Sequence, residues 1–311
     1  MLFKLKISYL IWIIFTCLLV NLIISNSKSK NFSLNNLKSF LEIYKPIRPK
    51  TLFCLILTTE KNLDTKTLVI YKTWAKKCDN FKFFTIKPKH DLEGNYWNSI
   101  VQPPGLSNDS YKNLTNKVYL SIKYVYNMYP DYDWYLKADD DTFIFVDNLK
   151  DFVFDKNSST PVTYGYDFKS YVENGYHSGG AGYLISNEAF RRIGSKLNEN
   201  FTYCPDTGVE DLDIGKCFRK LGVYPNKSID DLGRERFHIL GVLDHYNGIY
   251  PQWVYEMSSN QVQKGFDCCS DNSISFHYMS QKEIIVSNNI LTNMAQNFSF
   301  KHFLDKYLDR I

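Results

Sequence analysis

The chain has 311 residues, of which 44% are hydrophobic and 16% aromatic, and a formal net charge of +4. This composition excludes a disordered chain, and the length fits one large domain or two small ones. No basic cluster is interleaved with aromatic residues, which argues against nucleic acid as a partner.

An apolar run, ISYLIWIIFTCLLVNLII, covers residues 7–24 and follows Lys4 and Lys6. A helix of about 18 residues rises roughly 27 Å, close to the thickness of a membrane hydrocarbon layer. The preceding positive charges favour a cytosolic amino terminus. We predict a cytosolic tail over residues 1–6 and an uncleaved transmembrane signal anchor over residues 7–24, with a cleaved signal peptide as the alternative.

The chain after the anchor has features of a lumenal protein. Residues 25–45 are polar and predict a short stem. Cys17 lies in the apolar run and leaves an even set of six cysteines, which predicts disulfides, and the lack of a C-x-x-C pair argues against structural zinc. The adjacent Cys268 and Cys269 either bridge each other or pair elsewhere. Glycosylation sequons, only some of which we expect to be used, occur at Asn31, Asn108, Asn113, Asn157, Asn200, Asn226 and Asn297.

From residue 46 the apolar pattern alternates between strand and helix. Strands are predicted at 51–59, 81–86 and 133–141, and helices at 64–78 and 113–128. This alternation is typical of an α/β protein with a mainly parallel sheet. We find no internal repeat, and we predict one lumenal catalytic domain over residues 46–311.

Three consecutive aspartates end the third predicted strand, in WYLKADDDTFIFVDNL. Asp139 and Asp141 point to one side of an extended chain and Asp140 to the other. Ligands of open α/β sheets bind at the carboxyl ends of strands, where two carboxylates suit Mg²⁺ or Mn²⁺. Solvated turn residues are the alternative.

Two further segments carry candidate site residues. HSGGAGYLIS places glycines before a predicted strand, which permits either a tight turn or close approach of a ligand. CPDTGVEDLDIGKCF places Glu210, Asp211 and Asp213 at a predicted helix start. Carboxylates there either compensate the helix dipole or include a general base.

Five motifs in order resemble one known family. KTWAKKC, DWYLKADDDTFIFVDNL, GYHSGGAGYLIS, VEDLDIGKC and CCSDNSISFHY are similar to those of the core 1 branch of the inverting β1,3-glycosyltransferases, the family that includes Fringe. The resemblance covers the chain from about residue 46. It implies a GT-A fold, a single-pass type II membrane protein of the Golgi or endoplasmic reticulum, a nucleotide-sugar donor and Mn²⁺.

The resemblance assigns metal binding to Asp139, Asp141 and His277, and the general base to Asp211. Asp139 acts alternatively through a water or the ribose, and His238 is the competing histidine. Asp213 departs from the family, which has a small apolar residue there; it either faces solvent or competes as the acid.

The remaining roles carried over are binding contacts and disulfides. The pairs Cys54–Cys78 and Cys204–Cys217 match family cysteines. Lys117 is alternatively a solvated helix residue, and Trp253 a core residue. Nucleotide-sugar contacts are expected from Thr58, Lys117, Asp140, His277 and Tyr278, and acceptor contacts from Trp253, Glu210 and Gly180.

The function implied is transfer of galactose from UDP-galactose to O-linked N-acetylgalactosamine on Ser or Thr of glycoproteins, with a β1,3 bond. One alternative is a chaperone-like relative without activity, which the intact ADDDT argues against. Another is the same chemistry with a different sugar or acceptor, such as N-acetylglucosamine. The sequence allows a homodimer but does not specify it.

Overall fold

The computed structural model describes residues 49–88, 94–293 and 299–311. Residues 50–311 form one compact unit. Within the described ranges, no helix combines the length and the apolar character that crossing a membrane requires. The predicted tail, anchor and stem lie outside the described residues, so these boundaries stay predictions.

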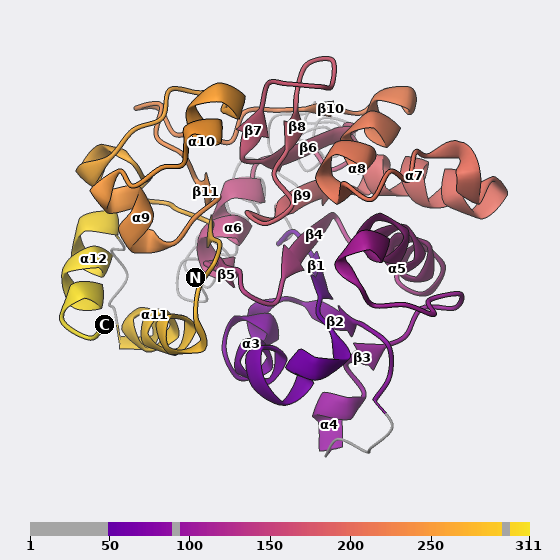
Figure 1. Cartoon of the computed structure of the whole chain (residues 1–311), viewed down its shortest axis with the longest axis horizontal. Coiled ribbons are helices and arrows are strands. Elements are labelled where there is room, and N and C mark those ends of the chain that lie inside the picture. Colours follow the sequence, from indigo (N-terminus) through magenta and orange to yellow (C-terminus); the bar gives the residue numbers. More distant parts are fainter. Residues whose placement is uncertain (1–48, 89–93, 294–298) are drawn as a thin grey trace, which may run out of the picture. The chain divides into compact units, whose positions relative to one another are not determined.

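A seven-stranded sheet forms the centre of this unit, in the order β10-β6-β9-β4-β1-β2-β3 (Figure 1). β9 alone runs antiparallel to its neighbours β4 and β6, and the other pairings are parallel. The predicted α/β class with a mainly parallel sheet is therefore confirmed. The strands are β1 (Leu52–Leu57), β2 (Asn80–Phe84), β3 (Ile100–Val101), β4 (Trp134–Asp139), β6 (Val162–Gly165), β9 (Tyr183–Ser186) and β10 (Tyr224–Pro225).

Helices cover both faces of the sheet. β1 is buried along its whole length, and its alternate side chains enter two different cores. α5, α7 and α8 pack on one face, and α3 and α6 on the other (Figure 1). The helices are α3 (Leu68–Lys72), α4 (Gly94–Trp97), α5 (Leu114–Met128), α6 (Val146–Val153), α7 (Asn187–Glu199), α8 (Glu210–Lys220), α9 (Val242–Asn247), α10 (Gln252–Met257), α11 (Gln281–Asn293) and α12 (Phe300–Leu308).

Two small sheets flank the large one. β5 (Phe143–Ile144) directly follows the aspartates and pairs with β12 (Ser275–Phe276), which pairs with β11 (Phe237–His238). This three-stranded sheet brings the segment after β12 to the carboxyl end of β4. β7 (Asp167–Phe168) and β8 (Tyr176–His177) form a hairpin that leads into the glycine turn before β9.

The predicted helix over residues 64–78 is wrong as one element. The structure has a π turn η2 (Leu63–Thr67), the short α3 and a 3-10 turn η3 (Trp74–Lys77). The break falls at Thr73, whose φ of −114° and ψ of −109° are not helical. The β-branched Thr73 donates its hydroxyl to the Val69 carbonyl, a local bond that competes with helix continuation. The other short turns are η1 (Glu60–Asn62), η4 (Tyr111–Asn113), η5 (Phe201–Tyr203) and η6 (Gly265–Asp267).

The six cysteines of the unit form three disulfides. Cys54–Cys78 links β1 to the end of η3, and Cys204–Cys217 links the loop before α8 to α8 itself. Both pairs are those that the resemblance implied. The adjacent Cys268 and Cys269 bridge each other, which resolves the alternative left open by the sequence.

Candidate active site

The aspartate run lies at the carboxyl end of β4, in the middle of the large sheet. Asp139 is the last residue of β4 and pairs with Leu57 of β1. Ligand atoms of Asp139, Asp141 and His277 all lie within 4.8 Å of one another, and all three side chains are partly exposed. We call these three residues the acidic cluster. The structure thus brings together the three residues that the resemblance assigned to metal binding.

His277 reaches the cluster because β12 ends immediately before it. Its Nε2 lies 3.3 Å from Oδ1 of Asp141, and its Nδ1 lies 3.3 Å from the Ile239 carbonyl. A side chain at Gly180 would collide with the imidazole ring, so the glycine makes room for His277. Tyr278 stacks on the ring at a centroid distance of 3.8 Å and is 61% exposed, which leaves it accessible to a ligand.

The acidic cluster fits a hard divalent cation such as Mg²⁺ or Mn²⁺. Neighbouring ligand atoms in an octahedral site with bonds of about 2.1 Å are about 3.0 Å apart. The 3.3 Å between Asp141 Oδ1 and His277 Nε2 is close to that value. Burial alone would raise the pKa of Asp141, but His277 and Lys66 outweigh it and lower that pKa to about 2. The carboxylate is therefore ionised and ready to bind a cation.

Asp140 has partners outside the cluster, in agreement with the prediction that it faces another side than Asp139 and Asp141, although it lies in the turn after β4 rather than in the strand. Its Oδ2 accepts hydrogen bonds from the Thr58 hydroxyl at 2.7 Å and from the Asn62 amide at 2.8 Å. Burial raises the pKa of this carboxyl. Asp140 therefore anchors the segment after β1 to the aspartate run, and the hydroxyl of Thr58 is occupied by that anchor rather than left free for a nucleotide.

A buried lysine, which the sequence analysis did not single out, links the acidic cluster to α8. The Lys137 ammonium lies 2.8 Å from Asp139 Oδ1 and 3.5 Å from Glu210 Oε2. It also donates to the Gly179 carbonyl at 3.0 Å. Burial lowers the pKa of Lys137, but the charges of Asp139 and Glu210 outweigh it and raise the pKa. A lysine in a buried central strand, two residues before Asp139, is the sequence signal that could have found it.

Asp211, the predicted general base, lies at the start of α8 beside the glycine turn. Its Oδ2 accepts from the Gly179 backbone N–H at 3.3 Å, and its Oδ1 accepts from the Leu212 N–H at 2.8 Å. Burial raises the pKa of this carboxyl above its ordinary value. The same glycine thus contacts both Lys137 and Asp211, which places the carboxylate next to the acidic cluster.

The other acids of α8 have structural partners. Glu210 is buried, and its Oε1 accepts from the Tyr183 hydroxyl at 2.6 Å, so it lies beneath the site surface rather than on it. Asp213 is fully buried and accepts from Thr115 at 3.0 Å and from the Thr207 N–H at 2.7 Å. The alternative that Asp213 faces solvent is wrong, because its carboxylate is buried and ties α8 to α5 and to the preceding loop.

For two predicted binding residues, Lys117 and Trp253, the structure contradicts the alternative interpretation given above. Lys117 is not a solvated helix residue: it is 3% exposed, and its ammonium is bound by the Thr58 carbonyl and Asp109. Burial lowers its pKa despite the nearby charge of Asp109. Trp253 is not a core residue: it is 38% exposed on α10, and its ring makes a T-shaped contact with Phe168. Part of the side chain therefore remains accessible to a ligand.

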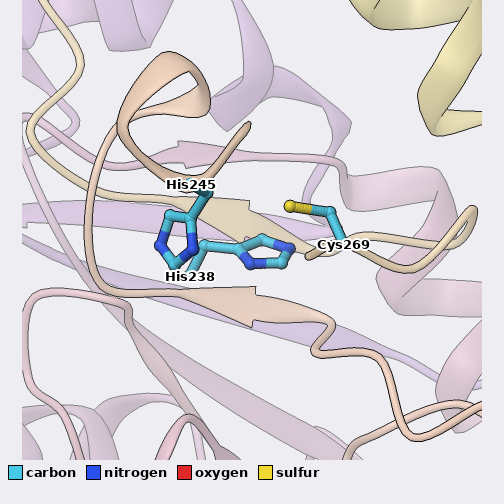
Figure 2. Close-up of side chains that lie close together, drawn as sticks. All are labelled: His238, His245 and Cys269. Carbon is cyan, nitrogen blue, oxygen red and sulfur yellow. The ribbon is translucent and has the colours of Figure 1, made fainter. Parts of the chain in front are cut away.

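A second group of potential metal ligands lies in the interior. His238, His245 and Cys269 are buried, and their ligand atoms also lie within 4.8 Å of one another (Figure 2). We call them the buried histidine cluster. Both ring nitrogens of His245 have partners, the Leu240 N–H at 3.2 Å and the Tyr250 hydroxyl at 3.1 Å. The Cys269 sulfur belongs to a disulfide.

This cluster does not fit a metal. The His238 ring stacks on Phe276 at 4.1 Å and its Nε2 lies 3.1 Å from the Ser273 hydroxyl. Burial lowers the pKa of both imidazoles, to about 3 for His245. Neutral, hydrogen-bonded and stacked, His238 is a core residue, whereas His277 faces the aspartates.

Residues 106–228 match the model of the galactosyltransferase family. This segment contains the aspartate run, the glycine turn and Asp211, all of which the site uses. The chain therefore carries a galactosyltransferase domain over these residues.

Two curated relatives are similar to this chain over more than half of its length. The glycoprotein-N-acetylgalactosamine 3-beta-galactosyltransferase 1 of Xenopus laevis is 30% identical over 249 residues, covering 78% of this chain and 66% of that one. Human chondroitin sulfate synthase 3 is 30% identical over 193 residues, covering 56% of this chain and 21% of the synthase. The chain thus spans less than two thirds of either relative. The resemblance found in the motifs is confirmed.

Among solved structures, the galactosyltransferase LgtC in complex with donor and acceptor sugar analogues is similar at a TM-score of 0.38 and 12% identity. That alignment covers 83% of this chain and 96% of LgtC. A TM-score this low carries no weight for fold or function.

Proposed function

We propose that the chain transfers galactose from UDP-galactose to O-linked N-acetylgalactosamine of glycoproteins, with inversion and a β1,3 bond. The transferred sugar, the acceptor and the position of the new bond follow the name of the similar Xenopus laevis enzyme. The UDP donor and the inversion follow the motif resemblance. The observation that carries the proposal is the acidic cluster beside the Asp211 carboxylate, to which it is joined through Lys137 and Gly179. We assign the central sheet to the GT-A type on the same resemblance.

Asp139, Asp141 and His277 would hold the cation, for which we propose Mn²⁺. When bound, a divalent cation neutralises the negative charge that collects on a departing diphosphate. Asp140 fixes the direction of the aspartate run by holding Thr58 and Asn62. The buried Lys137 ammonium holds Asp139 in place, with 2.8 Å between Lys137 Nζ and Asp139 Oδ1.

Asp211 would accept the proton of the attacking acceptor hydroxyl. The bond formed joins that oxygen to the anomeric carbon, and the bond broken releases the diphosphate with its electron pair. Because burial raises the pKa of Asp211, the carboxylate is a stronger base than an exposed aspartate. Its two backbone hydrogen bonds fix its orientation. The exposed ring of Trp253 is the proposed platform for the acceptor.

The test separates chemistry from binding. Asp211→Asn keeps the size of the side chain but removes the base, so turnover of a GalNAc-peptide should fall about 10²- to 10⁴-fold. UDP affinity in Mn²⁺ should change little. Asp213→Asn is the matched control, because that buried acid has only structural partners: it should lower stability more than turnover. Near-normal turnover in Asp211→Asn would defeat the assignment.

The sugar specificity needs a direct assay. We would incubate the lumenal part with Mn²⁺, a panel of UDP-sugars and a GalNAc-peptide, and identify products by mass spectrometry. Product from UDP-galactose alone is expected. Product only from UDP-N-acetylglucosamine would overturn the choice of donor while leaving the enzyme class intact.

We also propose a type II membrane location in the Golgi or endoplasmic reticulum, with the catalytic domain in the lumen. This rests on the apolar run over residues 7–24 and the lysines before it. Protease treatment of intact microsomes should spare the catalytic domain. A secreted product beginning near residue 27 would contradict the anchor.

A further inference from the structure

Among the described residues, three lysine ammoniums lie near the aspartate run. They differ in how exposed their side chains are and in how many protein groups hold them. The Lys117 and Lys137 side chains are each 3% exposed and are held by carboxylates and backbone carbonyls. The Lys66 side chain is 37% exposed. Only Lys66 can therefore change partner without opening the core.

Lys66 forms an ion pair with one carboxylate of the acidic cluster. Its ammonium lies 3.1 Å from Asp141 Oδ2 and 3.9 Å from Asp140 Oδ1. The turn η2 that carries Lys66 is fixed in place, since Thr67 bonds the Thr58 hydroxyl and Asn62 bonds Asp140. The backbone thus presents Lys66 to the cluster, while the long side chain stays adjustable.

A cation in the cluster would compete with this ammonium. The two oxygens of Asp141 are divided between His277 at 3.3 Å and Lys66 at 3.1 Å. A divalent ion bound by Asp141 would place two positive charges beside one carboxylate, which is unfavourable for Lys66. A diphosphate bound to that ion would supply new negative charge within reach of the same side chain.

We propose that Lys66 is an exchanging counter-ion, which binds Asp141 before cation and donor bind and moves to the nucleoside diphosphate when they do. This inference rests on the proposed function. Displacing Lys66 weakens binding of the cation alone, and the diphosphate recovers that loss by accepting the ammonium. Cation and nucleotide therefore bind cooperatively, and by reciprocity each raises the affinity for the other.

The test is Lys66→Met, with Mn²⁺ and UDP titrated by calorimetry. The affinity for Mn²⁺ alone should rise about threefold, because a partly exposed ion pair no longer competes. The affinity for UDP in saturating Mn²⁺ should fall about tenfold or more, because a charge-assisted hydrogen bond to phosphate is lost. A lysine that only stabilises the fold would not change the two constants in opposite directions.

Three controls make the result specific. Lys66→Arg keeps the charge and should retain the coupling. Lys72→Met, at an exposed position of the adjacent α3, should leave both constants unchanged. Uridine, which has no phosphate, should show no coupling to Mn²⁺ in the wild type.

The outcomes distinguish this inference from the proposed function. If the wild type binds Mn²⁺ and UDP but Lys66→Met changes neither constant, or changes both in one direction, the exchange is overturned and the active site stands. If the wild type binds no Mn²⁺ even with UDP, the cation site itself is wrong and the exchange falls with it.

Discussion

The acidic cluster and the buried histidine cluster each take one histidine from the same three-stranded sheet, yet only one cluster is suited to an ion. His238 lies on β11 and His277 follows the neighbouring β12. Side chains of the acidic cluster are partly exposed, and lysine ammoniums neutralise its carboxylates. Side chains of the buried cluster are sealed, and their polar atoms mostly bind protein groups or a disulfide partner.

The difference teaches that proximity of ligand-type residues is a weak criterion. In both groups the ligand atoms lie within 4.8 Å of one another. What separates them is charge and access: a hard cation needs anionic oxygens that can exchange a positive partner for it. Buried neutral imidazoles with hydrogen-bond partners instead stabilise a core.

Asp141→Ala should have the largest effect on the acidic cluster. Losing an indirect partner of a metal site costs about 10- to 100-fold in affinity, so losing a direct ligand should cost at least about 100-fold. We expect calorimetry to show loss of Mn²⁺-dependent UDP binding, with the circular dichroism spectrum unchanged. Wild-type binding of UDP and Mn²⁺ by the variant would show that the aspartates are turn residues.

His238→Ala should have the opposite profile. Removing a buried ring that stacks on Phe276 leaves a cavity and should lower the free energy of unfolding by about 2–4 kcal/mol. Mn²⁺ affinity should be unchanged. His277→Ala is the matched variant: it should lose Mn²⁺ affinity and little stability. If His238→Ala loses Mn²⁺ at constant stability, the two histidines have exchanged roles.

The smallest expected effect is on acid stability. Burial lowers the pKa of His245 to about 3 from 6.5, so below pH 6.5 the unfolded chain binds a proton that the folded chain does not. The contribution of neutral His245 to the free energy of unfolding is complete above pH 6.5. It is lost as the pH falls below 6.5, at about 1.4 kcal/mol per pH unit. His245→Gln should remove this contribution.

Denaturant unfolding at several pH values between 6.5 and 5 measures the contribution of His245 to the free energy of unfolding. The stability advantage of wild type over His245→Gln should shrink as pH falls. His302→Gln, on the exposed surface of α12, should leave the slope as it is. A constant difference between wild type and His245→Gln across this range would show that His245 is protonated in the folded state.

The sequence predicted the framework well because its signals are local. The apolar run of β1, the helical spacing of Val118, Ile122 and Val125 in α5, and Asp139 at the end of β4 all appear where they were expected. Asp140 and Asp141 instead lie in the turn after β4, so strand alternation does not set their directions.

The rest depends on contacts between distant segments. No local pattern could show that Asp213 bonds Thr115 and Thr207, or that η2 presents Lys66 to Asp141. Likewise, the need for glycine at position 180 appears only when the ring of His277 is in place. The choice of His277 over His238 came from resemblance; the geometry now gives it a physical reason.

The separation of the acidic cluster's residues along the chain has a consequence for folding and quality control. Asp139 ends a strand of the large sheet, while His277 is positioned by β12 of the small sheet. A bound cation would thus favour only the completed fold, and its contribution to stability would depend on free cation concentration. Depletion of that ion would then remove a link between the end of β4 and the segment after β12, because these two parts of the chain supply the ligands.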